Sequence, residues 1–106
     1  MGSLYLYRAG LRGTLFNGSN LMCADLRKAT FKDTGFRGAY LWRAALQFTK
    51  LNNSSFVYAD LSESNLAGAD MSQADFTNAK LCNARLTGAI LFIEDEHGEI
   101  IQGAIV

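Results

Sequence analysis

The residues that could carry out chemistry in this chain of 106 residues are few and lie apart. The one histidine, His97, stands in an acidic run with Glu94, Asp95, Glu96 and Glu99. A zinc site or a Cys–His nucleophile needs further nitrogen or sulfur groups close by, and no second histidine exists. The acidic run lacks the spacing of a calcium-binding loop, and no glycine-rich phosphate loop leads into a lysine. The sequence therefore predicts no catalytic residue, no metal site and no cofactor.

A five-residue period decides where every side chain of the chain lies. From Leu6 to Leu91 every fifth residue is Leu, Phe or Met, and from Ala9 to Ala89 the residue two places before each of these central residues is Ala, Ser or Thr. Five residues turn a helix by about 500° and carry a strand to its opposite face, so neither structure can bury this pattern. A short extended segment followed by a corner can bury both the central and the small residues. A chain that turns the same way at each corner forms a solenoid.

The phenylalanines indicate how many sides each coil has. Phe16, Phe36, Phe56 and Phe76 are central residues spaced by twenty. This spacing predicts four five-residue sides per coil, a square cross-section, and like side chains stacked at about 4.8 Å. The small residues mark where the wall passes close to the axis. Asp or Asn just before many central residues is suited to bonding the backbone at a tight corner.

Several stretches match a known repeat. These stretches resemble the repeat of pentapeptide-repeat proteins: Ala24-Asp25-Leu26, Ala59-Asp60-Leu61, Ser64-Asn65-Leu66, Ala69-Asp70-Met71 and Ala74-Asp75-Phe76. The resemblance implies an all-β fold, a right-handed quadrilateral β-helix, with the handedness taken from the family. Most members have no assigned activity. Some protect DNA gyrase from quinolones by imitating duplex DNA, and others are modules of secreted effectors.

We expect a single domain over 1–106, with regular repeats over about 4–93. The next central position after Leu91 falls on Glu96, which cannot point inward, so we expect a loop or hairpin over 94–98 and a terminal coil over 99–106. This coil has an apolar end without a cap, and such ends expose core. We therefore expect either a domain cut from a longer chain or a homodimer joined through the C-terminal coil, at Ile100, Ile101, Ile105 and Val106.

Outward-facing aromatic residues form the candidate protein-binding site. Met22 and Trp42 occupy the same position one coil apart, Tyr40 flanks the same side, and Tyr58 lies at a corner one coil higher. Arg43 and Glu63 complete the rim. A cluster of this composition resembles a small protein-docking patch, although scattered exposed aromatic residues are also ordinary.

Charge is balanced overall and uneven along the chain. Residues 1–53 carry eight Lys or Arg against two acids, and residues 54–106 carry eight acids against two bases. In a solenoid this gives a basic N-terminal end and an acidic C-terminal end. Two interpretations stay open: a surface for docking or head-to-tail association, and simply solvated faces. The neutral total argues against nucleic acid as a partner, and the basic half departs from the acidic rod that DNA mimicry requires.

The cysteines and the N-terminus bear on location. Cys23 and Cys82 would lie about 14 Å apart along the axis, too far for a disulfide, and free thiols are typical of a reducing compartment. No signal peptide and no apolar run of roughly 20 residues is present, so we expect a cytoplasmic protein without a membrane span.

The sequence thus predicts a non-enzymatic structural or protein-interaction module that binds a protein of unknown identity. The alternative is a DNA-mimicking modulator of DNA gyrase or topoisomerase, resembling the quinolone-resistance pentapeptide proteins.

Overall fold

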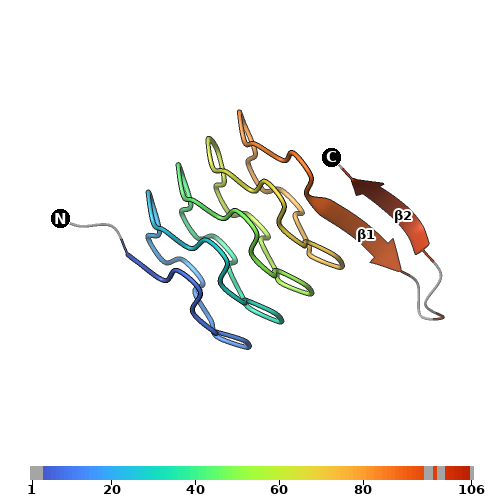
Figure 1. The fold of residues 1–106 in the computed structure, drawn as a ribbon, viewed down its shortest axis with the longest axis horizontal. Helices are drawn as coiled ribbons and strands as arrows, with labels where there is room; N and C mark the ends of the chain where they lie inside the picture. The colour runs from blue at the N-terminus through green and yellow to red at the C-terminus, as the bar shows by residue number, and fades with distance from the viewer. Residues whose placement is uncertain (1–3, 95–96, 98–99, 106) are drawn as a thin grey trace.

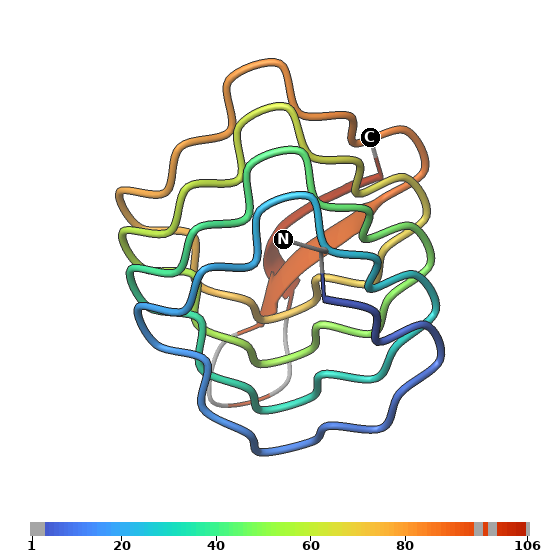
Figure 2. The ribbon, with the colours of Figure 1, turned by 90° about the vertical axis from the view of Figure 1, so that its left-hand side faces the viewer.

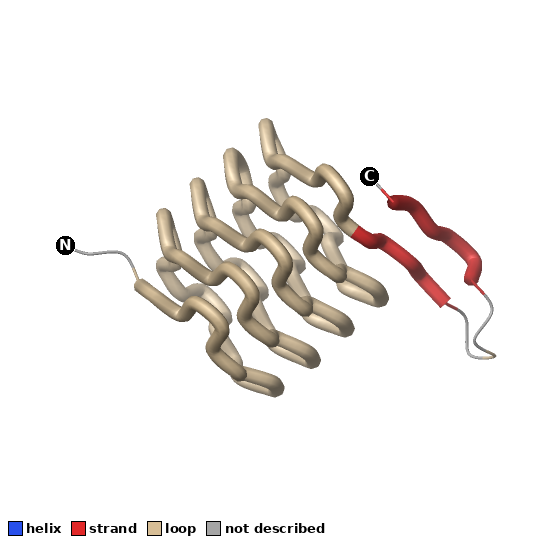
Figure 3. The backbone as a smooth tube through the Cα atoms, in the orientation of Figure 1, coloured by secondary structure: helices blue, strands red, loops and turns tan. Residues whose placement is uncertain are grey.

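The computed structural model describes residues 4–94, 97 and 100–105. The chain winds into square coils that stack side by side from the N-terminus to a C-terminal hairpin (Figure 1). A view from the N-terminal side shows the four walls of each coil, one behind the other (Figure 2). Within the described residues the continuous strands are β1 (Ile90–Glu94) and β2 (Ile100–Ile105), and the solenoid itself is built of turns and single-residue bridges (Figure 3). The predicted square solenoid is confirmed.

Bridges between successive coils set the rise of the solenoid. Each joins residues twenty apart in parallel, from Tyr5↔Asp25 to Asp70↔Ile90. We call the residue just before each central residue the bridge residue, and we name the four walls after the bridge residues of the first coil: the Tyr5, Gly10, Leu15 and Asn20 walls. A bridge residue turns both of its backbone groups toward the preceding coil. The N–H of Asp25 donates to Leu4 O at 2.9 Å, and its C=O accepts from Leu6 N–H at 2.8 Å.

Each corner is a β-turn with a positive φ at its third residue. This holds at every fifth residue from Arg8 (φ 61°) to Gly88 (φ 73°), and the turn is closed by bonds such as Ala44 N–H to Leu41 O at 3.0 Å. A positive φ at this position is what a type II turn requires. Twelve of these corner residues are not glycine. An L-residue in this region costs roughly 1–2 kcal/mol, which the ladder and the core must offset.

A glycine at such a corner is expected to stabilise the chain. Lys28 (φ 60°) is an exposed corner residue, and Lys28→Gly should raise the free energy of unfolding by about 0.5–1 kcal/mol, because the relief of strain outweighs the greater freedom of glycine in the unfolded chain. Lys50→Gly is the matched control, since Lys50 is an exposed bridge residue whose φ is not positive. Urea unfolding should show the control to be destabilised, and a loss of stability in Lys28→Gly would contradict the prediction.

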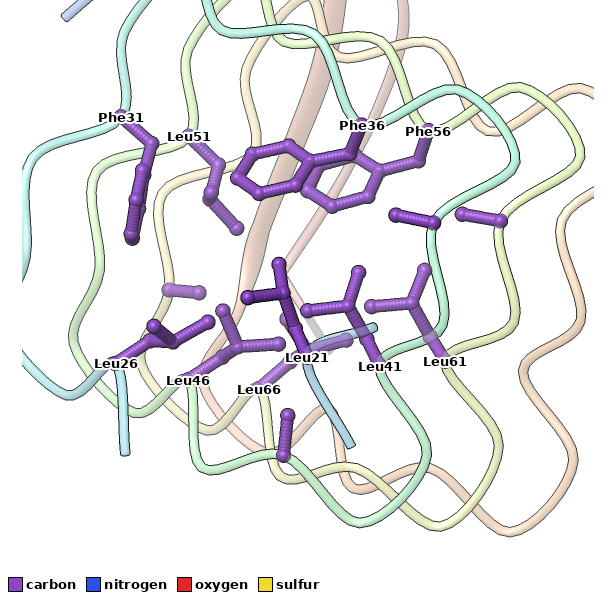
Figure 4. Packing of buried hydrophobic residues seen from close by; sticks show 14 of the residues in the cluster. Leu21, Leu26, Phe31, Phe36, Leu41, Leu46, Leu51, Phe56, Leu61 and Leu66 are labelled. Atoms are coloured by element: carbon purple, nitrogen blue, oxygen red, sulfur yellow. The ribbon is translucent and has the colours of Figure 1, made fainter. Parts of the chain in front are cut away.

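The central residues fill the inside of the tube as the period predicts. Phe16, Phe36, Phe56 and Phe76 stack with ring centroids 5.4, 4.7 and 4.9 Å apart and planes within 9° of parallel. Phe31 meets the ring of Phe36 edge-on at 5.3 Å. Leucines form like columns beside them, and Figure 4 shows Leu21, Leu41 and Leu61 in one such row. Central residues from Leu21 to Met71 are buried, whereas those nearer the two ends are only partly buried.

Hydroxyl and carboxylate side chains bond the backbone at the corners, and the bonds that the carboxylates accept confirm the role predicted for Asp and Asn before the central residues. At the small-residue position, Ser54 Oγ donates to Phe31 O at 2.7 Å and Ser64 Oγ donates to Leu61 O at 2.6 Å. At the bridge position, the carboxylate of Asp60 accepts from Ser62 N–H at 3.0 Å. Asp75 accepts from Thr77 N–H at 2.9 Å in the same way. The bonds from Ser62 N–H and Thr77 N–H pair backbone groups that the turn leaves unpaired, whereas Leu61 O also accepts the turn-closing bond from Ser64 N–H at 3.1 Å.

These carboxylates predict a loss of stability in acid. The backbone N–H of Ser62 holds the pKa of Asp60 below the usual 3.8, and the hydroxyl of Thr77 does the same for the pKa of Asp75. In the unfolded chain both pKa values return to normal, so this stabilisation is complete above pH 3.8 and is lost as the pH falls through the lower folded-state values. The melting temperature should therefore drop in that range. The drop should be smaller in the double variant Asp60→Asn, Asp75→Asn, which keeps an acceptor oxygen but does not titrate, and an equal drop would contradict this origin.

The C-terminal end differs from the prediction. A terminal coil over 99–106 is wrong for the described residues, because β2 runs antiparallel to β1 with Ile90 opposite Ile105 and Leu91 opposite Ala104. Glu96 cannot serve as the next central residue, so the chain turns back and pairs its backbone with β1 instead of building another wall. The bridge Asp70↔Ile90 makes β1 a continuation of the Gly10 wall.

The residues predicted to join two copies belong to this C-terminal end. The side chains of Ile100, Ile101 and Ile105, and Val106 altogether, lie outside the described part of the chain. A homodimer through them stays a prediction.

Candidate functional site

The Asn20 wall carries the side chains predicted to bind a protein. Leu21 N–H donates to Tyr40 O at 2.7 Å and Cys23 N–H donates to Trp42 O at 2.9 Å, so Met22 and Trp42 occupy equivalent positions in adjacent coils. The side chains of Tyr40 and Met22 are 54% and 42% exposed, and Trp42 is half-buried. The backbone around Tyr40 and Trp42 is bonded to the coils on both sides, and the backbone around Met22 is bonded to the second coil. The wall therefore presents apolar side chains on a rigid support.

Arg43 is the polar centre of one end of this wall. Its guanidinium carbon lies 4.5 Å from the centroid of the Trp42 ring, and its Nε lies 3.3 Å from the Glu63 carboxylate one coil on. A cation over an indole contributes about 0.5–1 kcal/mol at an exposed site, whereas an exposed ion pair contributes little. The contact with Trp42 is therefore the one that orients these two side chains.

Tyr58 forms a second pair, at the corner that leads into the same wall. The guanidinium carbon of Arg37 lies 5.5 Å from the centroid of its ring, which is 59% exposed. The structure thus brings the predicted residues together as two arginine–aromatic pairs at opposite corners, with Tyr40 between them. Arg37 was not predicted as part of this site. The twenty-residue period could have placed it there, because Arg37 lies one coil before Val57, and Val57 is next to Tyr58 in the sequence.

A further cluster that the sequence did not indicate lies on the Tyr5 wall. Arg27 makes two bonds of 2.8 Å to the Asp25 carboxylate and lies 5.2 Å from the centroid of the Tyr7 ring. Tyr5 and Tyr7 are 6.2 Å apart between centroids. The bonds from Arg27 lower the pKa of Asp25, and the contact with the side chain of Arg8 lowers the pKa of Tyr7. The cluster is basic and aromatic, and it belongs to the first two coils.

Cys23 and Cys82 also lie on the Asn20 wall, where both are exposed free thiols, as predicted. The described residues include no group of three or more His, Cys, Asp or Glu that could hold a metal ion. No helix capable of crossing a membrane occurs in the part of the chain that the structure describes.

These features define a class of protein, the right-handed quadrilateral β-helix that displays side chains on flat walls. The chain belongs to the pentapeptide-repeat family. The family model described as pentapeptide repeats matches residues 5–38, 39–76 and 54–91, with eight copies of the repeat.

Solved structures resemble the chain. The pentapeptide-repeat protein Rfr23 from the cyanobacterium Cyanothece 51142 is 27% identical, with a TM-score of 0.51, over 76% of this chain and 58% of that one. HetL, a pentapeptide-repeat protein involved in heterocyst differentiation regulation in the cyanobacterium Nostoc sp. strain PCC 7120, is 28% identical, with a TM-score of 0.46, over 94% and 50%. QnrB1, a plasmid-mediated fluoroquinolone resistance protein, is 20% identical, with a TM-score of 0.41, over 92% and 58%.

The chain spans only about half to three fifths of the length of these structures. No curated protein sequence matches it significantly.

Proposed function

We propose that the chain is a non-enzymatic module that binds another protein through the Asn20 wall. The surface comprises Met22, Tyr40, Trp42 and Tyr58 with Arg37, Arg43 and Glu63. The observation that carries the proposal is the set of exposed aromatic side chains held between two arginines on one rigid wall. Trp, Tyr and Arg are the residues that most often dominate the binding energy of protein interfaces. A preformed surface also loses little conformational entropy on binding.

Affinity capture with matched variants tests this surface. We expect Trp42→Ala to reduce capture of the partner at least tenfold, because the substitution removes both the ring and the support of Arg43. Phe48→Ala is the control, since Phe48 is an aromatic residue at a corner of the Tyr5 wall that is more exposed (62%) than the half-buried Trp42. Both variants should keep the circular dichroism of the parent. A partner retained by Trp42→Ala, or lost equally in both variants, would contradict the proposal.

DNA mimicry toward DNA gyrase is the alternative function, and the charges give it less support. Asp60, Asp70 and Asp75 do occupy bridge positions in the later coils. The earlier coils carry Arg8, Arg27 and their basic neighbours, which would repel a DNA-binding groove. A supercoiling assay distinguishes the two functions, since inhibition of gyrase by the parent chain and by Trp42→Ala alike would favour mimicry.

The free thiols are consistent with a cytoplasmic location, which we propose for the chain.

A further inference from the structure

Among the described residues, the first coil leaves one edge of the backbone ladder unpaired. In later coils a bridge residue uses both backbone groups: Gly35 N–H donates to Thr14 O at 3.1 Å, and Gly35 O accepts from Phe16 N–H at 2.7 Å. The bridge residues of the first coil, Tyr5, Gly10, Leu15 and Asn20, have no such partner among the described residues. Their N–H and C=O groups face away from the solenoid. A row of unpaired groups of this kind is a template for pairing with another strand.

The same coil exposes apolar side chains. Leu15 and Tyr5 have the largest exposed fractions of the described large hydrophobic residues, 73% and 66%. The central residues Leu6, Leu11 and Phe16 are only partly buried, while their equivalents one coil on, which are Leu26, Phe31 and Phe36, are 0% exposed. An unpaired edge and an open core therefore coincide at this end.

We propose that this end pairs with a second copy of the chain about a twofold axis at Gly10. Residues directly opposite in an antiparallel pair exchange both N–H···O bonds, which suits bridge residues that turn both groups outward. Gly10 would face Gly10 of the partner subunit, and Tyr5 would face the partner's Leu15. Because Gly10 lies midway between Tyr5 and Leu15, the axis makes this Tyr–Leu contact twice. The two most exposed apolar side chains of the described part become cross-strand neighbours.

The walls of the first coil lie at successive heights along the solenoid, and the Tyr5 wall is the outermost. A twofold axis at Leu15 would therefore bring the Tyr5 walls of both copies into the same space. An axis at Gly10 instead places each Tyr5 wall beside the Leu15 wall of the other copy. The contact also has sufficient area. The shorter dimensions of the molecule, 27 and 25 Å, correspond to roughly 600 Å² per copy, so a pair buries about 1,200 Å², the lower end of the range for stable interfaces. An isologous contact closes on itself and gives a dimer, not a filament.

Cysteine crosslinking tests the register. In a Cys23→Ser, Cys82→Ser background, Gly10→Cys should form an interchain disulfide under mild oxidation, because the Cα atoms of such a pair lie about 5.5 Å apart. Lys50→Cys is the control, at the same position of the same wall two coils along. Non-reducing electrophoresis measures both rates. Crosslinking of Gly10→Cys that is no faster than that of Lys50→Cys would overturn the proposed axis.

Association in solution tests the surface. Sedimentation velocity should show a concentration-dependent dimer that Leu15→Lys weakens at least tenfold and that Phe48→Lys leaves unchanged. In this register Arg12 would lie opposite the partner's Arg8. Within its own chain Arg12 forms an ion pair with Asp33 at 3.2 Å. Arg8→Glu should therefore strengthen the dimer several-fold, and raising the salt concentration should strengthen the parent dimer. A monomer at every concentration, a dimer unaffected by Leu15→Lys, or weakening by Arg8→Glu would each overturn the proposal. Leu15→Lys, Phe48→Lys and Arg8→Glu leave the Asn20 wall unchanged, so partner capture by these three variants reports on the proposed function separately.

Discussion

Phe36→Ala is expected to lower the free energy of unfolding by about 3–5 kcal/mol, one of the two largest effects that we predict for a single substitution in this chain. Phe36 is fully buried, with stacked contacts to Phe16 and Phe56 at 5.4 and 4.7 Å and an edge-on contact to Phe31 at 5.3 Å. Alanine would leave a cavity in the middle of the stack. Each wall is fixed by the coils on both sides, so the walls cannot collapse to fill it.

The ends of the same stack provide the control. Phe76 contacts one phenylalanine of its column, Phe56, and is only partly buried. Phe76→Ala should therefore cost clearly less than Phe36→Ala, about half as much on the basis of buried area. Chemical denaturation of both variants gives the comparison. Equal losses would contradict the interpretation that stacking within closed walls stabilises the centre of the solenoid.

The interior could be predicted from the sequence because the residue type at each inward position indicates how much space surrounds it. Phe16, Phe36, Phe56 and Phe76 recur at the length of one coil, and a residue that recurs in this way must face its own kind. The small residues at Ala39 and Ala59 are buried where the wall is close to the axis. In a solenoid each coil contacts only its neighbours, so a local pattern determines the whole fold.

The C-terminal end and the surface could not be predicted in the same way. Glu96 signals that the coil stops, but nothing in the pattern distinguishes a loop that returns to the wall from a strand that reverses along β1. The pairing of Arg37 with Tyr58 depends on side-chain rotamers that a five-residue period does not constrain. The corner residues could not be predicted either, because Lys28 and Tyr58 adopt a positive φ that residues other than glycine disfavour. The ladder and the core impose that conformation, and it could be inferred only after the turn was known.

Ser55→Pro is expected to lower the free energy of unfolding by about 3 kcal/mol or more. Ser55 is the bridge residue of the Leu15 wall in the third coil, where its N–H donates to Thr34 O at 3.0 Å and its C=O accepts from Phe36 N–H at 2.7 Å. Proline removes the donor, leaves the carbonyl of Thr34 unpaired inside the ladder, and places its ring against the preceding coil. Because each coil is supported only by its neighbours, this defect divides the solenoid into two shorter stacks.

Leu15→Pro is the matched control, at the same position of the same wall. The N–H of Leu15 has no partner among the described residues and faces the open end, so proline there should cost less than about 1 kcal/mol in a dilute, monomeric sample. At higher concentration the same variant should lose the proposed dimer, since it can no longer donate across the twofold axis. Thermal unfolding at two concentrations separates these effects. If Leu15→Pro destabilised the monomer as much as Ser55→Pro, the loss would come from the proline ring and not from the missing hydrogen bond, and the ladder would contribute less to stability than the parallel bridges indicate.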